Sequence, residues 1–419
     1  MKAERQGNKV TAALCLSFII PLVFALGNYY FVQYTSGNVL CLLYYACTIM
    51  TLYFYCHFKV IIHQSGVCLF LFLVLYTIII IITDEYELTY RTIFMVPIFL
   101  FSYVNAQIKD TTYRRIFLLF SITAVLVTAL QTLLTLVQYP DAARTLASTS
   151  YAKYGSAKYR QMGAGGFEFI YSLVTLFPVS IVAMLRTHGK CKMLAVSGML
   201  CIACTILSSG YMTAILLMIL SCILFLCNKS KKTMYLTIIM LPVIIGVFIL
   251  YRDFFAEQLI AISEACTSTA VKEHLVEIAD IIAQNATAED LDRVELYRKS
   301  VSSFIAHPLI GSYIADGSSA ISGHSTLLDL LGGAGLLCFI PYVGFLITWY
   351  KNILHLLHDH LIRLGWTITS FTYVVLQAVN PIFASYLIIF SYMSIASSVL
   401  YACDKFYTCK IVKWGYTSD

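Results

Sequence analysis

The sequence is poor in charged residues, which excludes an ordinary soluble domain. Asp, Glu, Lys and Arg make up 12% of its 419 residues, whereas soluble domains contain about 25%. Hydrophobic residues make up 59%. Apolar runs such as 66–82 and 233–250 are long enough to cross roughly 30 Å of hydrocarbon. The sequence therefore predicts an all-α, polytopic membrane protein.

Several chemical signatures are also missing. There is no Walker phosphate loop and no dinucleotide fingerprint, so a nucleotide-driven pump or a nucleotide-sugar enzyme with a soluble domain is disfavoured. The 14 cysteines lie mostly within apolar runs, so no disulfide framework is expected. The histidines of "HLLHDH" are predicted to flank the bilayer in an inside loop rather than form a zinc site. We therefore expect no metal, no cofactor and no nucleic-acid partner.

Apolar windows along the chain predict about twelve membrane spans. These windows lie near 10–31, 39–56, 66–83, 90–106, 113–137, 167–185, 192–208, 210–227, 233–250, 324–350, 366–383 and 385–402. With both termini in the cytoplasm, every short inside loop contains Lys or Arg, whereas the outside connection 83–90 is acidic. Because cytoplasmic loops are enriched in Lys and Arg, this pattern favours cytoplasmic termini.

The spans divide the chain into three parts. Residues 1–250 hold roughly the first nine spans and a long outside loop at 138–166, and residues 324–419 hold the last three spans and a cytoplasmic tail. Between them, residues 251–323 form a second outside loop. Apolar residues in this loop recur at the three- and four-residue spacings of amphipathic helices. We expect it to be a large helical extracytoplasmic loop lying on the membrane surface.

The ionisable residues are predicted to gather at the outer ends of the spans. The centres of the spans contain uncharged polar groups such as Gln131 and Gln377, whereas ion-coupled transporters usually bury charges there. This distribution favours chemistry at the outer interface over passage through the bundle. The outer residues of interest are Lys158, Arg160, Glu168, Arg293, Arg298 and His324.

These residue types suit a diphosphate and a hydroxyl nucleophile. Guanidinium groups match phosphate oxygens with paired hydrogen bonds, and an ammonium group adds a point charge. The alternative is a solvated loop that pairs with anionic lipid headgroups. An imidazole such as that of His324 can act as a general base. His324 can equally be an interfacial residue in the first turn of a helix that Ser322 caps.

Two segments resemble a known family. The segment "RVELYRKSVSSFIAHPLIGSYIADGSSAISGHSTLLDLLGGAGLL", residues 293–337, combines an Arg-bearing helix, a Pro-Leu-x-Gly turn, a His-Ser pair and a glycine-rich helix start. It resembles the signature region of bacterial O-antigen and capsular polysaccharide polymerases and of the related O-antigen ligases. The segment "RQMGAGGFEFIYS", residues 160–172, resembles the Gly-Gly-Phe-acidic-Phe element of exopolysaccharide polymerases.

One departure separates the two branches of that family. Ligases and many polymerases have a Ser-Arg pair at the start of a later span, whereas this chain reads "LSSGYMTAILL" at 207–217. Because no arginine follows Ser209, a phosphate contact from this position is not expected. The departure favours the polymerase over the ligase.

The resemblance implies a reaction and a set of partners. A polymerase of this family transfers a glycan from undecaprenyl diphosphate to the sugar end of another lipid-linked repeat unit, at the outer face of the bacterial cytoplasmic membrane. It implies His324 as the base or as the group that orients the hydroxyl, with Glu168 as the competing base. Implied diphosphate ligands are Arg160, Arg293 and Arg298, with Lys158 as a weaker candidate. A chain-length regulator and a flippase of the same pathway are the expected protein partners.

Three other functions stay open at this point. An O-antigen ligase would use the same chemistry with lipid A core as the acceptor. A flippase or exporter of lipid-linked sugars would need a charged, hydrated path between the helices, which the charge-poor spans disfavour. A membrane scaffold without catalysis is the third.

Overall fold

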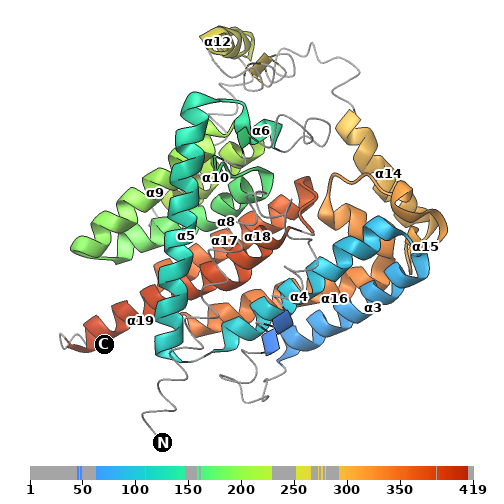
Figure 1. The fold of residues 1–419 in the computed structure, drawn as a ribbon, viewed down its shortest axis with the longest axis horizontal. Helices are drawn as coiled ribbons and strands as arrows, with labels where there is room; N and C mark the ends of the chain where they lie inside the picture. The colour runs from blue at the N-terminus through green and yellow to red at the C-terminus, as the bar shows by residue number, and fades with distance from the viewer. Residues whose placement is uncertain are drawn as a thin grey trace, which may run out of the picture.

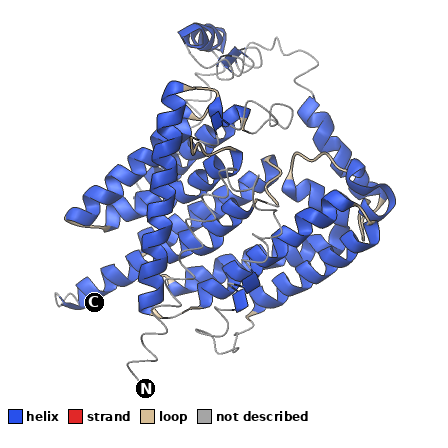
Figure 2. Cartoon of the chain, viewed as in Figure 1, coloured by secondary structure: helices blue, strands red, loops and turns tan. Residues whose placement is uncertain are grey.

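The computed structural model describes most of the chain from residue 63 onwards. The described ranges are 63–108, 110–146, 158–159, 162–228, 252–265, 292–383 and 385–413, with isolated positions in 45–49 and 272–279. All regular structure in these ranges is helical, and no strand occurs in them, as Figure 2 shows. The predicted all-α class is confirmed for this part of the chain.

Six helical segments in the described ranges are long and apolar enough to cross a membrane. They are α3 (Gln64–Thr83), α5 (Thr111–Gln138), α8 (Phe167–Arg186), α9 (Lys190–Ser208), α16 (Thr326–Leu356) and the segment Leu387–Lys405. The chain is therefore a helical membrane protein. The predicted spans 10–31 and 233–250, and most of 39–56, lie outside the described residues, so the count of about twelve stays a prediction.

Further helices complete the bundle and its surroundings (Figure 1). Beside the six segments run α4 (Tyr86–Gln107), α10 (Met212–Asn228) and α17 (His360–Val379). The segment Leu387–Lys405 is built from α18 (Tyr386–Phe390), the π-helical turn η4 (Ser391–Ala396) and α19 (Ser397–Lys413). From the predicted outer loop, the structure describes α12 (Arg252–Ala265) and α14 (Asp292–Ala306).

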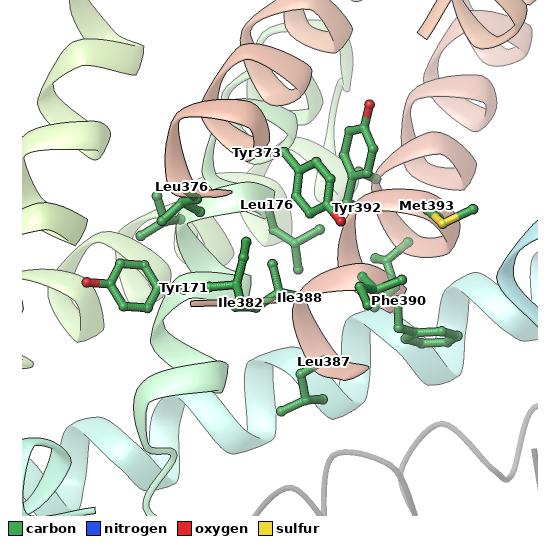
Figure 3. Packing of buried hydrophobic residues seen from close by; sticks show 14 of the residues in the cluster. Tyr171, Leu176, Tyr373, Leu376, Ile382, Leu387, Ile388, Phe390, Tyr392 and Met393 are labelled. Carbon is green, nitrogen blue, oxygen red and sulfur yellow. The ribbon is translucent and has the colours of Figure 1, made fainter. Parts of the chain in front are cut away.

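Helix α8 lies in the centre of the bundle and α9 at its edge. In the apolar window of α8, 72% of residues are buried, against 17% in α9. Side chains of α8, α17 and α18 interlock, as Figure 3 shows for Leu176, Leu376 and Ile388. The rings of Tyr373 and Tyr392 stack with centroids 4.1 Å apart. Because α8 is buried on nearly all sides, the position of its first turn is fixed by packing rather than by lipid.

Short connections reverse the chain and define two ends of the bundle. We name these ends after the first and last turns of α8. The Glu168 end contains residues 84–85, 209–211, 307–325 and 380–385, and the Arg186 end contains 108–110, 187–189 and 357–359. Contacts along α3 and α16 confirm the antiparallel arrangement, since Asn352 Nδ2 donates to Ser65 Oγ at 2.8 Å at the Arg186 end.

At the Arg186 end, charged groups are held in a compact network. Arg186 Nη2 donates to both carboxylate oxygens of Asp359, at 2.7 and 2.6 Å. Asp359 also caps α17 by accepting from Ile362 N. The buried carboxylate of Asp404 accepts from the backbone N–H groups of His358 and Asp359 and lies 3.0 Å from His358 Nδ1. This network fastens α8, α17 and α19 to one another.

Candidate functional site

A polar pocket of about 450 Å³ lies at the Glu168 end. Its wall is formed by the last half of α3, the first half of α4, the first turn of α8, the start of α16 and the segment 381–385. The remaining wall comes from α15 (Tyr313–Asp316), the short 3-10 helix η3 (Gly317–Ala320) and the residues that follow it. We call residues 317–325 the rim loop. Segments far apart in the sequence therefore meet around one cavity.

The wall combines carboxyl groups, hydroxyl groups and aromatic rings. The carboxyl groups are Glu168 and Asp329. Hydroxyl groups come from Thr92, Ser318, Ser322, Thr326 and Ser385, and rings from Tyr76, Phe167, Tyr313 and Phe383. Among the wall residues that the structure describes, there is no Lys, Arg or His. The pocket thus offers hydrogen-bond acceptors, hydroxyls and ring faces.

Glu168 contributes an unpaired carboxylate oxygen to this pocket. Gly166 is the N-cap of α8, so Glu168 lies in the first helical turn. Ser385 and the backbone of Leu387 lie beside its carboxyl group. Oε2 of Glu168 and Oγ of Ser385 are both buried, and neither has a hydrogen-bond partner beyond the contact between their two side chains. Buried polar atoms are nearly always paired, so this pair of atoms marks the pocket as a place where a ligand supplies hydrogen bonds.

Asp329 holds the surrounding elements together. Its Oδ1 accepts from Ser300 Oγ at 2.6 Å and from Ser322 Oγ at 2.7 Å, and its Oδ2 accepts from Ser325 N at 3.1 Å. Ser300 lies on α14, so one buried carboxylate joins α14, the rim loop and α16. Because these donors use both of its oxygens, we assign Asp329 a positioning role.

Glu85 fixes the other half of the rim loop. It lies in the short α3–α4 connection and accepts a hydrogen bond from Ser318 N at 2.6 Å and another from the Ser318 hydroxyl. Gly317 next to it has a positive φ of 61°, and a Cβ there would lie 2.7 Å from Glu85 Oε2. The rim loop is therefore held at two points, by Glu85 and by Asp329. The pocket-lining residues Ile321, Ser322 and Gly323 lie between Ser318, which Glu85 holds, and Ser325, which Asp329 holds.

The Pro-Leu-x-Gly turn is structural. It inserts into a break in α16 at Gly335, whose φ of 67° is not helical. The N–H groups of Leu336 and Leu337 bond to the carbonyls of Pro308 and Leu309, at 2.9 and 3.0 Å. A Cβ on Gly311 would lie 2.1 Å from the oxygen of Gly333. The two glycine-containing motifs thus form one interlock, in which the glycines at 332–335 let this turn and α14 approach closely.

His324 lies outside α16, which corrects the expected helix start. Ser325, not Ser322, is the N-cap of α16, and its side chain accepts from Leu328 N. The Ser322 hydroxyl instead donates to Asp329 and accepts from His324 N. The side chain of His324 is exposed on the rim loop, next to the pocket residue Gly323.

The predicted diphosphate ligands lie outside the pocket wall or outside the described residues. Arg160 and the side chain of Arg293 belong to the latter group. Arg298 is exposed on α14, two residues before Ser300. Lys158 is exposed and donates to the Tyr139 hydroxyl at 2.9 Å, with its ammonium 4.1 Å from the ring centroid. This hydrogen bond raises the pKa of Lys158.

Sequence reasoning missed the roles of Glu85, Ser300, Asp329 and Ser385. Glu85, Asp329 and Ser385 are polar residues near predicted span boundaries, and Ser300 lies within the predicted outer loop. These are weak signals, because many such residues only face headgroups or water. Their roles depend on contacts between segments that the sequence does not reveal. Of the two predicted bases, the structure places Glu168 in the pocket wall and His324 on its rim.

Comparisons with known proteins add no family for this chain. No protein-family model matches the sequence, and no curated protein matches it.

Proposed function

We propose that the chain is a polysaccharide polymerase that joins lipid-linked oligosaccharide repeat units. The observation that carries the proposal is the meeting of the two family-like segments in one pocket. The first segment supplies Phe167 and Glu168, and the second supplies the rim loop and the start of α16. Because both segments line the same polar cavity, we infer that they contribute to one binding site.

The proposed orientation puts this pocket outside the cytoplasm. The helices that begin at the Arg186 end carry basic residues near their N-terminal ends, namely Arg114 and Arg115 in α5 and Lys190 and Lys192 in α9. Cytoplasmic loops are enriched in such residues, so we assign the Arg186 end to the cytoplasmic face of a bacterial cytoplasmic membrane. The pocket then opens at the extracytoplasmic face, where a lipid-linked acceptor and donor meet.

The proposed reaction is glycosyl transfer with a lipid diphosphate as the leaving group. A hydroxyl oxygen of the acceptor sugar bonds to the anomeric carbon of the donor as the bond from that carbon to the diphosphate breaks. The hydroxyl proton passes to Glu168, and the electron pair of the broken bond leaves with the diphosphate. The position of Glu168 in the pocket favours it over His324 as the base. His324 then orients an acceptor group at the rim.

The leaving diphosphate needs cations, because negative charge grows on its bridging oxygen during bond cleavage. The proposal assigns this task to Arg160, Arg293 and Arg298, with a smaller contribution from Lys158. Arg298 is exposed on α14, which Asp329 fastens to the rim loop through Ser300. The hydrogen bond between Ser300 and Asp329 thus fixes the position of α14, and of the cations on it, relative to the pocket.

The test is polymerisation in vitro. The purified protein in lipid nanodiscs is mixed with undecaprenyl-diphosphate-linked repeat units, and the products are separated by size. The proposal expects a ladder of glycans that differ by one repeat. A single addition to lipid A core, with no ladder, would identify a ligase instead. Transbilayer movement of the lipid-linked unit in liposomes without any new glycosidic bond would identify a flippase.

A further inference from the structure

We propose that the pocket is the acceptor-sugar subsite and that it selects sugars whose reacting residue carries no acidic group. The inference rests on the proposed function and adds the chemical class of the acceptor. Three features of the pocket support it: unpaired oxygens in its wall, fixed aromatic rings, and an acidic wall. Each feature suits a neutral or N-acetylated sugar ring.

Two buried oxygens, Glu168 Oε2 and Ser385 Oγ, determine which hydrogen bonds a ligand in the pocket can make. Glu168 Oε2 is a buried acceptor and Ser385 Oγ beside it is a buried hydroxyl, and neither has a hydrogen-bond partner beyond the contact between the two side chains. A sugar hydroxyl can donate to the carboxylate, and a neighbouring hydroxyl can accept from or donate to the serine. Hydrogen bonds to an ionised group are about twice as strong as neutral ones. Two adjacent hydroxyls of a sugar ring therefore match this pair of atoms.

The aromatic residues supply flat apolar surfaces held in fixed positions. The ring of Phe383 packs edge-on against Tyr76, with centroids 5.1 Å apart, and Phe167 packs edge-on against Tyr171 at 4.7 Å. Ring faces of this kind pack against the C–H face of a sugar ring while its hydroxyls reach polar atoms. A cavity of about 450 Å³ falls within the roughly 300–1,000 Å³ range of small-molecule sites.

The charge of the wall discriminates against acidic sugars. The wall contains the carboxyl groups of Glu168 and Asp329, and none of its described residues is a Lys, Arg or His. A uronic acid bound here would bring a third carboxyl group into a space whose described wall offers no cation to pair with it. The diphosphate of the donor is excluded from the pocket by the same argument. It must lie outside the wall, where Arg298 is exposed on α14.

A glycan array tests this selectivity without requiring turnover. The fluorescently labelled protein in nanodiscs is incubated with bacterial glycan fragments grouped by their terminal sugar: neutral, N-acetylated or uronic acid. We expect binding only among the neutral and N-acetylated groups. Glu168→Gln should weaken that binding by about tenfold, the loss of one charge-assisted hydrogen bond. It should also admit glycans with a uronic acid end, because one negative charge is removed.

Two further variants make the test specific. Ser385→Ala should weaken binding about threefold to tenfold, the loss of one neutral hydrogen bond, without admitting acidic ends. Glu264→Gln removes a carboxylate from the exposed helix α12 and should leave the binding pattern unchanged. Size-exclusion profiles and unfolding temperatures of all variants report whether they are folded.

The outcomes separate this inference from the proposed function. Equal binding of acidic and neutral ends, no binding to any glycan, or an unchanged pattern in folded Glu168→Gln would each overturn the subsite. Selective binding without a polymer ladder would discard the polymerase and retain the subsite. A ladder built from repeat units with acidic acceptor ends would retain the polymerase and remove the subsite.

Discussion

The two ends of the bundle treat their charged groups differently. At the Arg186 end, Asp359 accepts hydrogen bonds from Arg186 and from a backbone N–H group, and Asp404 accepts from backbone N–H groups. These carboxylates hold neighbouring helices together. At the Glu168 end, Glu85 and Asp329 are used in the same way, but Glu168 keeps a buried oxygen with no hydrogen-bond partner beyond the contact with the Ser385 side chain. All of these carboxylates are at least partly buried, so burial does not separate them. The number of hydrogen bonds that each one accepts from the protein does: a carboxylate that joins helices accepts several, and Glu168 has an oxygen free to accept one from a ligand.

The largest expected effect comes from removing the charge of Glu168. Glu168→Gln should lower the rate of polymerisation by about a hundredfold to ten-thousandfold, the usual contribution of a positioned base. The shape of the side chain is kept, so the unfolding temperature should stay close to that of the parent protein. Band intensities of the glycan ladder over time measure the rate. A variant with parental rates would show that the unpaired carboxylate is not the base.

The interlock should be the most sensitive point of the fold. In Gly311→Ala, the new Cβ would meet the backbone oxygen of Gly333 at a residue whose φ is 72°. We expect a loss of stability of about 3 kcal/mol or more, from backbone strain and displacement of α16. Thermal unfolding in detergent measures it. Gly189→Ala is the control, because its φ is also positive but nothing lies within 4 Å of the new Cβ.

Substitutions of Asp329 test whether this carboxylate, whose two oxygens both accept hydrogen bonds, positions the rim loop or takes part in the reaction. Asp329→Ala should lower polymerisation by about tenfold to a hundredfold, because it leaves the donors of Ser300, Ser322 and Ser325 unpaired and releases the rim loop. Asp329→Asn keeps one acceptor oxygen and should recover much of the rate. A spin label at residue 324 should become more mobile in Asp329→Ala and stay ordered in Asp329→Asn. Equal loss of rate in both variants, with an ordered label, would point to a chemical role.

The Arg186 end should affect stability without affecting turnover. Arg186→Ala leaves Asp359 without its guanidinium partner in a mostly buried position, and we expect a loss of about 1–3 kcal/mol. The rate per folded molecule in the nanodisc assay should match that of the parent protein. A large fall in rate at unchanged stability would break the contrast between the two ends.

The smallest effect is expected from the rim. His324→Ala removes an exposed imidazole that follows the pocket residue Gly323, and polymerisation should fall by about tenfold or less. The pH dependence of the rate should keep its shape, because the base is elsewhere. Loss of nearly all activity in His324→Ala, with Glu168→Gln active, would reverse the assignment of the two residues.

The sequence was informative about the membrane and less so about the pocket. Long apolar runs predict helices such as α3 and α16 because a bilayer requires apolar segments of that length. The proximity of Glu168 to Ser385 was not predictable, since it depends on how α8 packs against the segment before α18. The start of α16 was misplaced because Ser322 and Ser325 both have the side chain of an N-cap, and only the bond from Ser322 to Asp329 decides between them.

The break at Gly335 divides α16 into two pieces of unequal length. The short upper piece carries Thr326 and Asp329, and the long lower piece packs along α3. The N–H groups of Leu336 and Leu337 just after that break bond to the turn at 308–311, and Ser300 of α14 bonds to Asp329 before it. The segment from α14 to the turn is therefore fixed to both pieces of α16, so the position of α14 and the shape of the pocket wall at Asp329 depend on each other.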